Sequence, residues 1–66
     1  MRFRDSLRRI MRERGYTAAD VERLSGVNHR LVAMYYRGQS VPMAPNLGRL
    51  AKCLGVTMDE LWGEGI

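Results

Sequence analysis

The 66-residue sequence contains one cysteine, one histidine and two prolines. A single cysteine forms no internal disulfide, and one histidine with one cysteine is no zinc ligand set, so we expect neither a metal nor a cofactor. No apolar run approaches about 18 residues, and the N-terminal segment alternates charged with apolar positions, unlike a signal peptide. We therefore expect a cytoplasmic protein with no membrane partner.

Sequence patterns of catalysis are also missing. There is no Ser-His-acid set, no pair of carboxylates on an inward face and no glycine-rich loop after a strand, so we do not expect an enzyme. The composition, 45% hydrophobic and 27% charged, is that of a folded globular chain. At this length we expect one domain that spans residues 1–66.

Acidic residues are absent from the centre of the chain. Between Glu22 and Asp59 there are five basic residues, namely Arg23, Arg30, Arg37, Arg49 and Lys52. Together with a net charge of +4, this favours an anionic partner, with nucleic acid first and a membrane surface or an acidic protein second. Most of the basic residues are arginine, whose planar guanidinium suits phosphates and guanine edges, although an arginine bias can also follow genome composition.

Three segments share one local pattern. Each has a glycine, an apolar residue, a Thr or Asn, three further residues and a second apolar residue, as in GYTAADV (15–21), GVNHRLV (26–32) and GVTMDEL (55–61). Glycine suits the left-handed position after a helix, Thr or Asn caps the next helix, and the two apolar residues form a hydrophobic staple. Three tight corners between helices predict an all-α protein without strands.

Apolar spacing predicts five short helices in a compact bundle. Their expected ranges are about 4–14, 18–24, 29–37, 45–54 and 58–63. Pro45 suits the first position of the fourth helix. The side chains expected to face inward are Phe3, Leu7, Ile10, Met11, Ala18, Val21, Leu24, Leu31, Val32, Tyr35, Leu47, Leu50, Ala51, Leu54 and Leu61.

The helix expected at 29–37 begins with cations. Its first turn holds His29 and Arg30, whereas Asp20 and Glu60 stand near the starts of the second and fifth helices. Cations there cost about 0.3–1 kcal/mol each, because the start of a helix carries positive backbone charge. An anionic ligand bound at this end would offset the cost. The alternative is that both are solvated surface residues.

Three stretches of the chain resemble one family. RERGYTAADVERLSGV, YYRGQSVP and LGRLAKCLGVTMDELW resemble the lambda repressor and Cro-like helix-turn-helix domains of the xenobiotic-response-element (XRE) family, over about residues 5–62. The resemblance implies that the helices at 18–24 and 29–37 form a helix-turn-helix. It also implies a repressor-like regulator of transcription that inserts the second of these helices into the major groove of double-stranded DNA.

The resemblance also implies the contact residues. Those expected to reach base edges are Asn28, His29, Arg30 and Met34. Those expected to reach phosphates are Thr17, Arg37, Gln39 and Ser40. A two-fold homodimer would use the last helix, where Met58 and Trp62 are the candidate interface residues. Alternatively, Trp62 closes the core over the first helix.

Two positions depart from the family pattern. Ala18 stands where the family usually has a phosphate-clamping Gln, and Tyr36 stands where it tends to have a Glu, so an ion pair from that site to an arginine of the first helix is lost. Tyr36 could pack in the core, bond a phosphate or serve another partner. The arginines of the first helix are most simply a solvated basic face, and Cys53 a small hydrophobic residue.

These departures keep other functions open. The main alternative is a protein-binding adaptor or antitoxin-like regulator with the same fold, which would use the surface around Tyr36. A third possibility is an RNA-binding protein in which Tyr35 and Tyr36 stack on bases.

Overall fold

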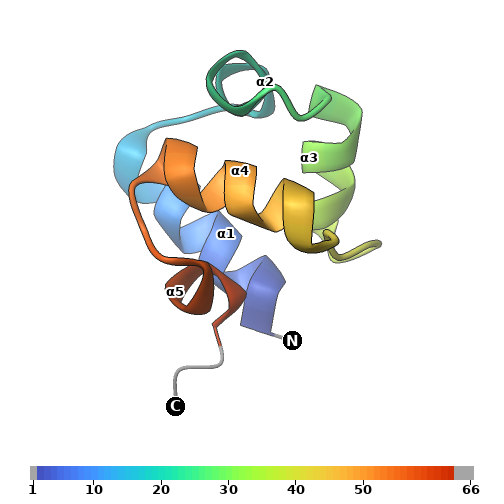
Figure 1. Cartoon of the computed structure of the whole chain (residues 1–66). Helices are drawn as coiled ribbons and strands as arrows, with labels where there is room; N and C mark the ends of the chain where they lie inside the picture. The colour runs from blue at the N-terminus through green and yellow to red at the C-terminus, as the bar shows by residue number, and fades with distance from the viewer. Residues whose placement is uncertain (1, 64–66) are drawn as a thin grey trace.

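The computed structural model describes residues 2–63, which form five helices and no strand (Figure 1). The helices are α1 (Arg2–Arg14), α2 (Ala18–Ser25), α3 (His29–Arg37), α4 (Ala44–Leu54) and α5 (Met58–Trp62). The expected all-α fold is therefore confirmed. The bounds lie within two residues of those expected, and Pro45 occupies the second helical position because α4 begins at Ala44.

The helices pack around one centre. In Figure 1, α1 and α4 lie in the middle, α2 crosses above them, α3 stands along one side and α5 lies below. α3 packs against α1 and α2, and α5 packs against α1 and α4. The helix-turn-helix formed by α2 and α3 is therefore carried on a frame made by the other three helices.

The core draws on all five helices and on the corner after α2. Its buried side chains are Phe3, Leu7, Ile10, Met11, Val21, Val27, Val32, Tyr35, Leu50, Ala51, Leu54 and Leu61. The ring of Phe3 contacts that of Tyr35 edge-to-face, with 5.8 Å between centroids, and lies 5.9 Å from that of Trp62. Phe3 thereby links α1, α3 and α5.

Two residues expected to face inward do not. Leu24 is 48% exposed and Leu31 is 36% exposed, so these two predictions are wrong. In α2 the residue after Leu24, Ser25, is half-buried, and its hydroxyl donates to the Val21 carbonyl over 2.6 Å. In α3 the stripe of Val32 and Tyr35 is completed by Tyr36, which packs against the core. A narrow inward stripe on a short helix leaves no room for a further large side chain.

The three corners have the geometry that their shared pattern predicts. Gly15, Gly26 and Gly55 all adopt left-handed backbone angles. The side-chain oxygens of Thr17, Asn28 and Thr57 each accept a hydrogen bond from a backbone N–H group in the first turn of α2, α3 and α5, respectively. Hydrogen bonding within each corner thus satisfies backbone groups that the helix ends would leave unpaired.

The caps of α2 and α5 predict a loss of stability in acid. The Thr17 N–H donates to Asp20 over 2.9 Å and the Thr57 N–H to Glu60 over 2.8 Å, and these bonds hold the pKa of both carboxyls below their ordinary values of 3.8 and 4.5. The folded-state pKa lies below the unfolded one, so the stabilisation is present above the ordinary values and is lost as the pH falls through the folded-state pKa.

We therefore expect the thermal midpoint of the protein to fall with pH below about 4.5. Asp20→Asn should start from a lower midpoint at neutral pH and lose less on acidification, because one of the titrating caps is gone. Thermal melts of both proteins across this range, followed by circular dichroism, measure the difference. If the thermal midpoints of the two proteins fall in parallel as the pH is lowered, the acid sensitivity does not come from the Asp20 cap.

Candidate nucleic-acid interface

The start of α3 is exposed and is held by local hydrogen bonds. Asn28 caps the helix, and its Oδ1 accepts the Arg30 N–H over 2.7 Å. The Nδ1 atom of His29 lies 3.1 Å from Oε1 of Glu22 on α2. The fold thus brings a carboxylate to the first turn of α3, although the chain from 23 to 58 has none, and the His29 ring has a partner within the protein.

The outer face of α3 carries Arg30, Met34 and Arg37 at intervals of four and three residues, which places them on one side of the helix. All three are exposed, and 37% of Met34 is accessible. Within residues 2–63 neither Arg30 nor Arg37 has a carboxylate partner. Unlike Asn28 and His29, these side chains are free to bind something outside the fold.

The remaining predicted contact residues flank α3. Thr17 is exposed at the start of α2, where its Oγ1 accepts the Asp20 N–H. Gln39 is exposed and Ser40 half-buried in the loop after α3, and the Gln39 N–H donates to the Met34 carbonyl over 2.9 Å. This bond and the left-handed Gly38 end α3 and fix the direction in which the loop leaves it.

Arg8 of α1 holds the end of α3, a contact that the sequence did not predict. Its Nε donates to the Tyr36 carbonyl over 2.7 Å, and its guanidinium carbon lies 5.1 Å from the centre of the Tyr36 ring. Arg8 is half-buried, so at this position the interpretation of the α1 arginines as a solvated face is wrong. The family tends to have a Glu at position 36, which could form an ion pair with α1. Here the Arg8 guanidinium over the Tyr36 ring links α1 and α3 instead.

A second arginine of α1 lies against the turn after α3. The Arg4 side chain crosses Gly38 so closely that a Cβ atom there would lie 2.8 Å from the Arg4 Cδ. Gly38 has a φ of +82°, and Gly26 has nearly the same φ, +81°, but no atom within 4 Å of such a Cβ. A Cβ added at Gly26 would therefore cause backbone strain alone, whereas a Cβ added at Gly38 would cause backbone strain and a steric conflict with Arg4.

We expect Gly26→Ala to lower the free energy of unfolding by roughly 1–2 kcal/mol, the cost of left-handed backbone in a residue with a Cβ. Gly38→Ala should cost more, because the Arg4 side chain must also leave its position. The excess should vanish when Gly38→Ala is made in an Arg4→Ala background. Urea unfolding of the unmodified protein, the three single variants and the double variant measures each value, and equal losses for the two single glycine variants would show that the Arg4 contact is unimportant.

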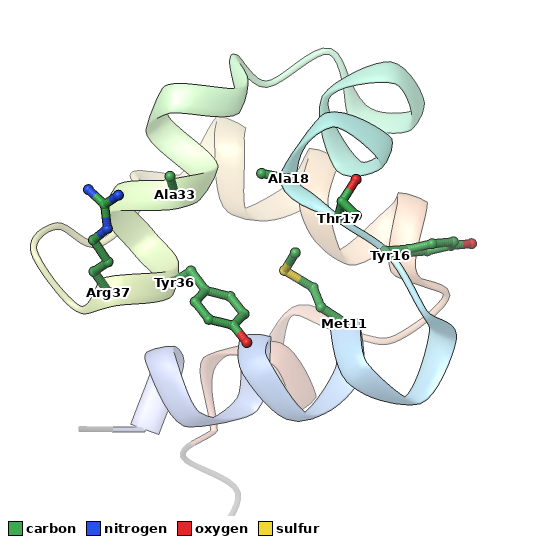
Figure 2. Close-up of a pocket in the computed structure, with 7 residues that line it drawn as sticks. All are labelled: Met11, Tyr16, Thr17, Ala18, Ala33, Tyr36 and Arg37. Atoms are coloured by element: carbon green, nitrogen blue, oxygen red, sulfur yellow. The ribbon is translucent and has the colours of Figure 1, made fainter.

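The two departures from the family pattern line one hollow. Ala18 of α2 and Tyr36 of α3 face it together with Ala33 and Met11, and its volume is about 310 Å³ (Figure 2). Thr17 and Arg37, two of the predicted phosphate contacts, also line it, and Figure 2 shows the Arg37 guanidinium turned away from the hollow. No local sequence pattern indicates that Ala18 and Tyr36, on two different helices, line the same space.

The proposed dimer residues lie at another hollow, of about 370 Å³, between α4 and α5. Met58 is 41% exposed there, while Trp62 is half-buried and its ring packs near Phe3. Trp62 therefore closes the core over α1, and its outer edge lines this hollow together with Leu47. Cys53 is half-buried on α4, and burial raises the pKa of its thiol, as expected of a small hydrophobic residue.

The part of the chain that the structure describes contains no cluster of three or more His, Cys, Asp or Glu side chains placed to bind a metal ion. None of its helices has the length and apolar character needed to cross a bilayer.

The family model for the helix-turn-helix matches residues 7–61, which include α2, α3 and most of the supporting frame. No curated protein and no solved structure matches the chain. The match covers the corner between α2 and α3, the exposed outer face of α3 and the Arg8 contact that holds its end. The chain belongs to the helix-turn-helix family of the lambda repressor-like (XRE) type, whose members are DNA-binding regulators.

Proposed function

We propose that this protein is a sequence-specific regulator of transcription, repressor-like in action, that inserts α3 into the major groove of DNA. The observation that carries the proposal is the outer face of α3, where Arg30, Met34 and Arg37 are exposed and both arginines lack a carboxylate partner within residues 2–63. Arginine forks onto the O6 and N7 atoms of guanine, and an apolar side chain meets the thymine methyl group.

The positions of the predicted contacts fit this mode of binding. Arg30 and Met34 would read bases, while Asn28 and His29 keep one side-chain nitrogen each for bases or phosphates after their internal contacts. Arg37, Gln39 and Ser40 lie at the end of α3, and Thr17 lines the same hollow as Arg37. Phosphate contacts from these residues would fix the register in which the base-reading face meets the bases.

A two-fold dimer would place two copies of α3 about 34 Å apart, one turn of DNA. We assign its interface to the hollow between α4 and α5, where Met58, Leu47 and the edge of Trp62 offer an apolar surface. Met43, at the start of α4, is 79% exposed and extends this surface.

Selection of bound duplexes from a random pool tests the function, the specificity and the symmetry in one experiment. We expect enrichment of an inverted repeat whose half-sites are about 10 base pairs apart. A single enriched half-site would exclude the dimer but keep sequence-specific binding. No enrichment, with protein still bound to duplexes, would exclude sequence-specific recognition.

Salt dependence separates a DNA-binding protein from a protein-binding adaptor with the same fold. If the protein neutralises five phosphates, log K should fall with log salt at a slope of about −4 to −5. Fluorescence anisotropy of a labelled, selected duplex measures this slope between about 50 and 200 mM salt. Failure to bind any duplex at the lowest salt would favour the adaptor, in which Tyr36→Ala should impair binding of the protein partner.

A further inference from the structure

The hollow bordered by α1, α2 and α3 is apolar where the family pattern places polar side chains. Its floor and walls are Met11, Ala18, Ala33 and Tyr36, which come from three helices and converge on one space (Figure 2). Ala18 and Ala33 line the hollow from α2 and α3 with short side chains, which leave its space unfilled. A glutamine in place of Ala18 would fill part of this space.

The walls are held in place and do not depend on a ligand to form them. Met11 is 4% exposed and belongs to the core. One side of the Tyr36 ring is covered by the Arg8 guanidinium, which also bonds the Tyr36 carbonyl. A wall fixed in this way loses little conformational entropy when a ligand binds. A volume of about 310 Å³ lies at the lower end of the range for small-molecule sites.

Charge and shape indicate the class of ligand. The residues that line the hollow include no carboxylate, and they include one cation, Arg37, which has no ion-pair partner in the described part of the chain. Exposed side chains change rotamer within nanoseconds, so the guanidinium of Arg37 can turn towards a bound anion. The flat ring of Tyr36 and the sulfur of Met11 both make favourable contacts with aromatic rings.

We infer that this hollow binds a small aromatic anion of the aryl carboxylate class and that the bound ligand weakens DNA binding. The ring system lies between Ala18 and Ala33 against Tyr36, and the carboxylate pairs with Arg37. The effect on DNA rests on the proposed function, because Thr17 and Arg37, which line the hollow, are two of the proposed phosphate contacts. A ligand between them occupies the place of the DNA backbone and engages one of its cations.

Binding is tested first with the protein alone, with naphthoate as the probe and naphthamide as the uncharged control. In protein labelled at the methionine methyl groups, naphthoate should shift the Met11 signal saturably, with a dissociation constant on the order of 1 mM for a ligand of this size. The signals of Met43 and Met58, which lie outside the hollow, should not move. Naphthamide should bind about ten-fold more weakly, and Arg37→Gln should remove the difference between the two probes.

Variants that fill the hollow provide the control for its location. Ala18→Gln introduces the usual family residue from α2, and Ala33→Leu fills the same space from α3. Both should abolish the Met11 response while thermal melts show a folded protein. The site is disproved if Met11 gives no saturable shift, if both filled variants respond like the unmodified protein, or if naphthoate and naphthamide bind equally.

The effect on DNA is measured separately, on a duplex that the unmodified protein binds. Naphthoate near saturation should raise the dissociation constant of the duplex at least about five-fold, while equimolar acetate should not, because its ring-free anion changes only the ionic strength. Ala18→Gln should bind the duplex in the presence or absence of naphthoate. A Met11 response without any change in DNA affinity would overturn the competition. If the protein binds no duplex at all, the proposed function fails, and the methyl titration still decides whether the aryl carboxylate site exists.

Discussion

Replacing Arg30 by alanine should lower the affinity for a selected duplex by about 5- to 150-fold, or roughly 1–3 kcal/mol. Arg30 is exposed at the start of α3, and its guanidinium has no carboxylate partner among residues 2–63. A bidentate contact to guanine is lost in the variant, so discrimination should relax at one base pair and stay unchanged at the others. Anisotropy titrations against the selected duplex and its single-base variants measure both effects.

Arg9→Ala is the matched control for this experiment. It also removes one positive charge, but from the side of the protein where α1 meets α5. There the Arg9 Nη1 atom lies 3.6 Å from Oε2 of Glu13. We expect its effect on the selected duplex to be within about two-fold, because the general attraction to DNA changes little when one distant charge is lost. If Arg30→Ala weakens binding to random and selected duplexes equally, Arg30 is a phosphate contact and reads no base.

Replacing Phe3 by alanine should lower the free energy of unfolding by about 3–5 kcal/mol, the usual cost of removing a buried aromatic ring. Phe3 is fully buried, and its ring contacts those of Tyr35 and Trp62. A chain of this length has a total stability of about 3–10 kcal/mol, so the loss is a large part of it. The thermal midpoint should fall by at least about 12 °C, as followed by circular dichroism.

Met43→Ala serves as the control because Met43 is 79% exposed, and its truncation should change the stability by no more than about 0.5 kcal/mol. Phe3→Leu keeps most of the side-chain volume but removes the two ring contacts. Its thermal midpoint should fall by less than that of Phe3→Ala. A midpoint within a few degrees of the unmodified protein for Phe3→Ala would mean that α1 does not depend on this residue for its packing.

Local sequence rules predicted the features of this fold that depend on neighbours in the chain. Gly26 ends α2 and Asn28 caps α3 only two residues later, so one short stretch of sequence predicted both the end of α2 and the start of α3. The same rules placed Thr57 and Glu60 at the start of α5. Because each of these interactions spans four residues or fewer, no knowledge of the tertiary structure was needed.

The errors arose where the tertiary structure decides which side chain fills a given space. Leu24 has helical spacing from Val21, yet it is 48% exposed. Hydropathy ranks leucine high, but it does not show whether the helices packed against α2 leave room for a leucine at this position. A stripe on a helix as short as α2 is set by its neighbours more than by its own composition.

In the candidate site, too, local features could be predicted from the sequence and contacts between distant residues could not. The exposed start of α3 followed from its position after a capped corner, whereas Arg8 and Tyr36 are 28 residues apart, and no local pattern joins them. The hollow at Ala18 also depends on three helices. One feature of the sequence is consistent with the Arg8 contact. Arg4 and Arg8 are four residues apart and so lie on one side of α1, and both contact the end of α3 or the turn after it.

The outer face of α3 contributes no side chain to the buried core. Arg30, Met34 and Arg37 lie opposite the buried stripe of Val32 and Tyr35, whereas the Asn28 side chain caps α3 and the His29 ring contacts Glu22 of α2. Under the proposed function, exchanges at Arg30 and Met34 would alter base preference, and an exchange at Arg37 would alter affinity, each with little penalty in folding. Exchanges at positions 28 and 29 would in addition break contacts that hold the start of α3.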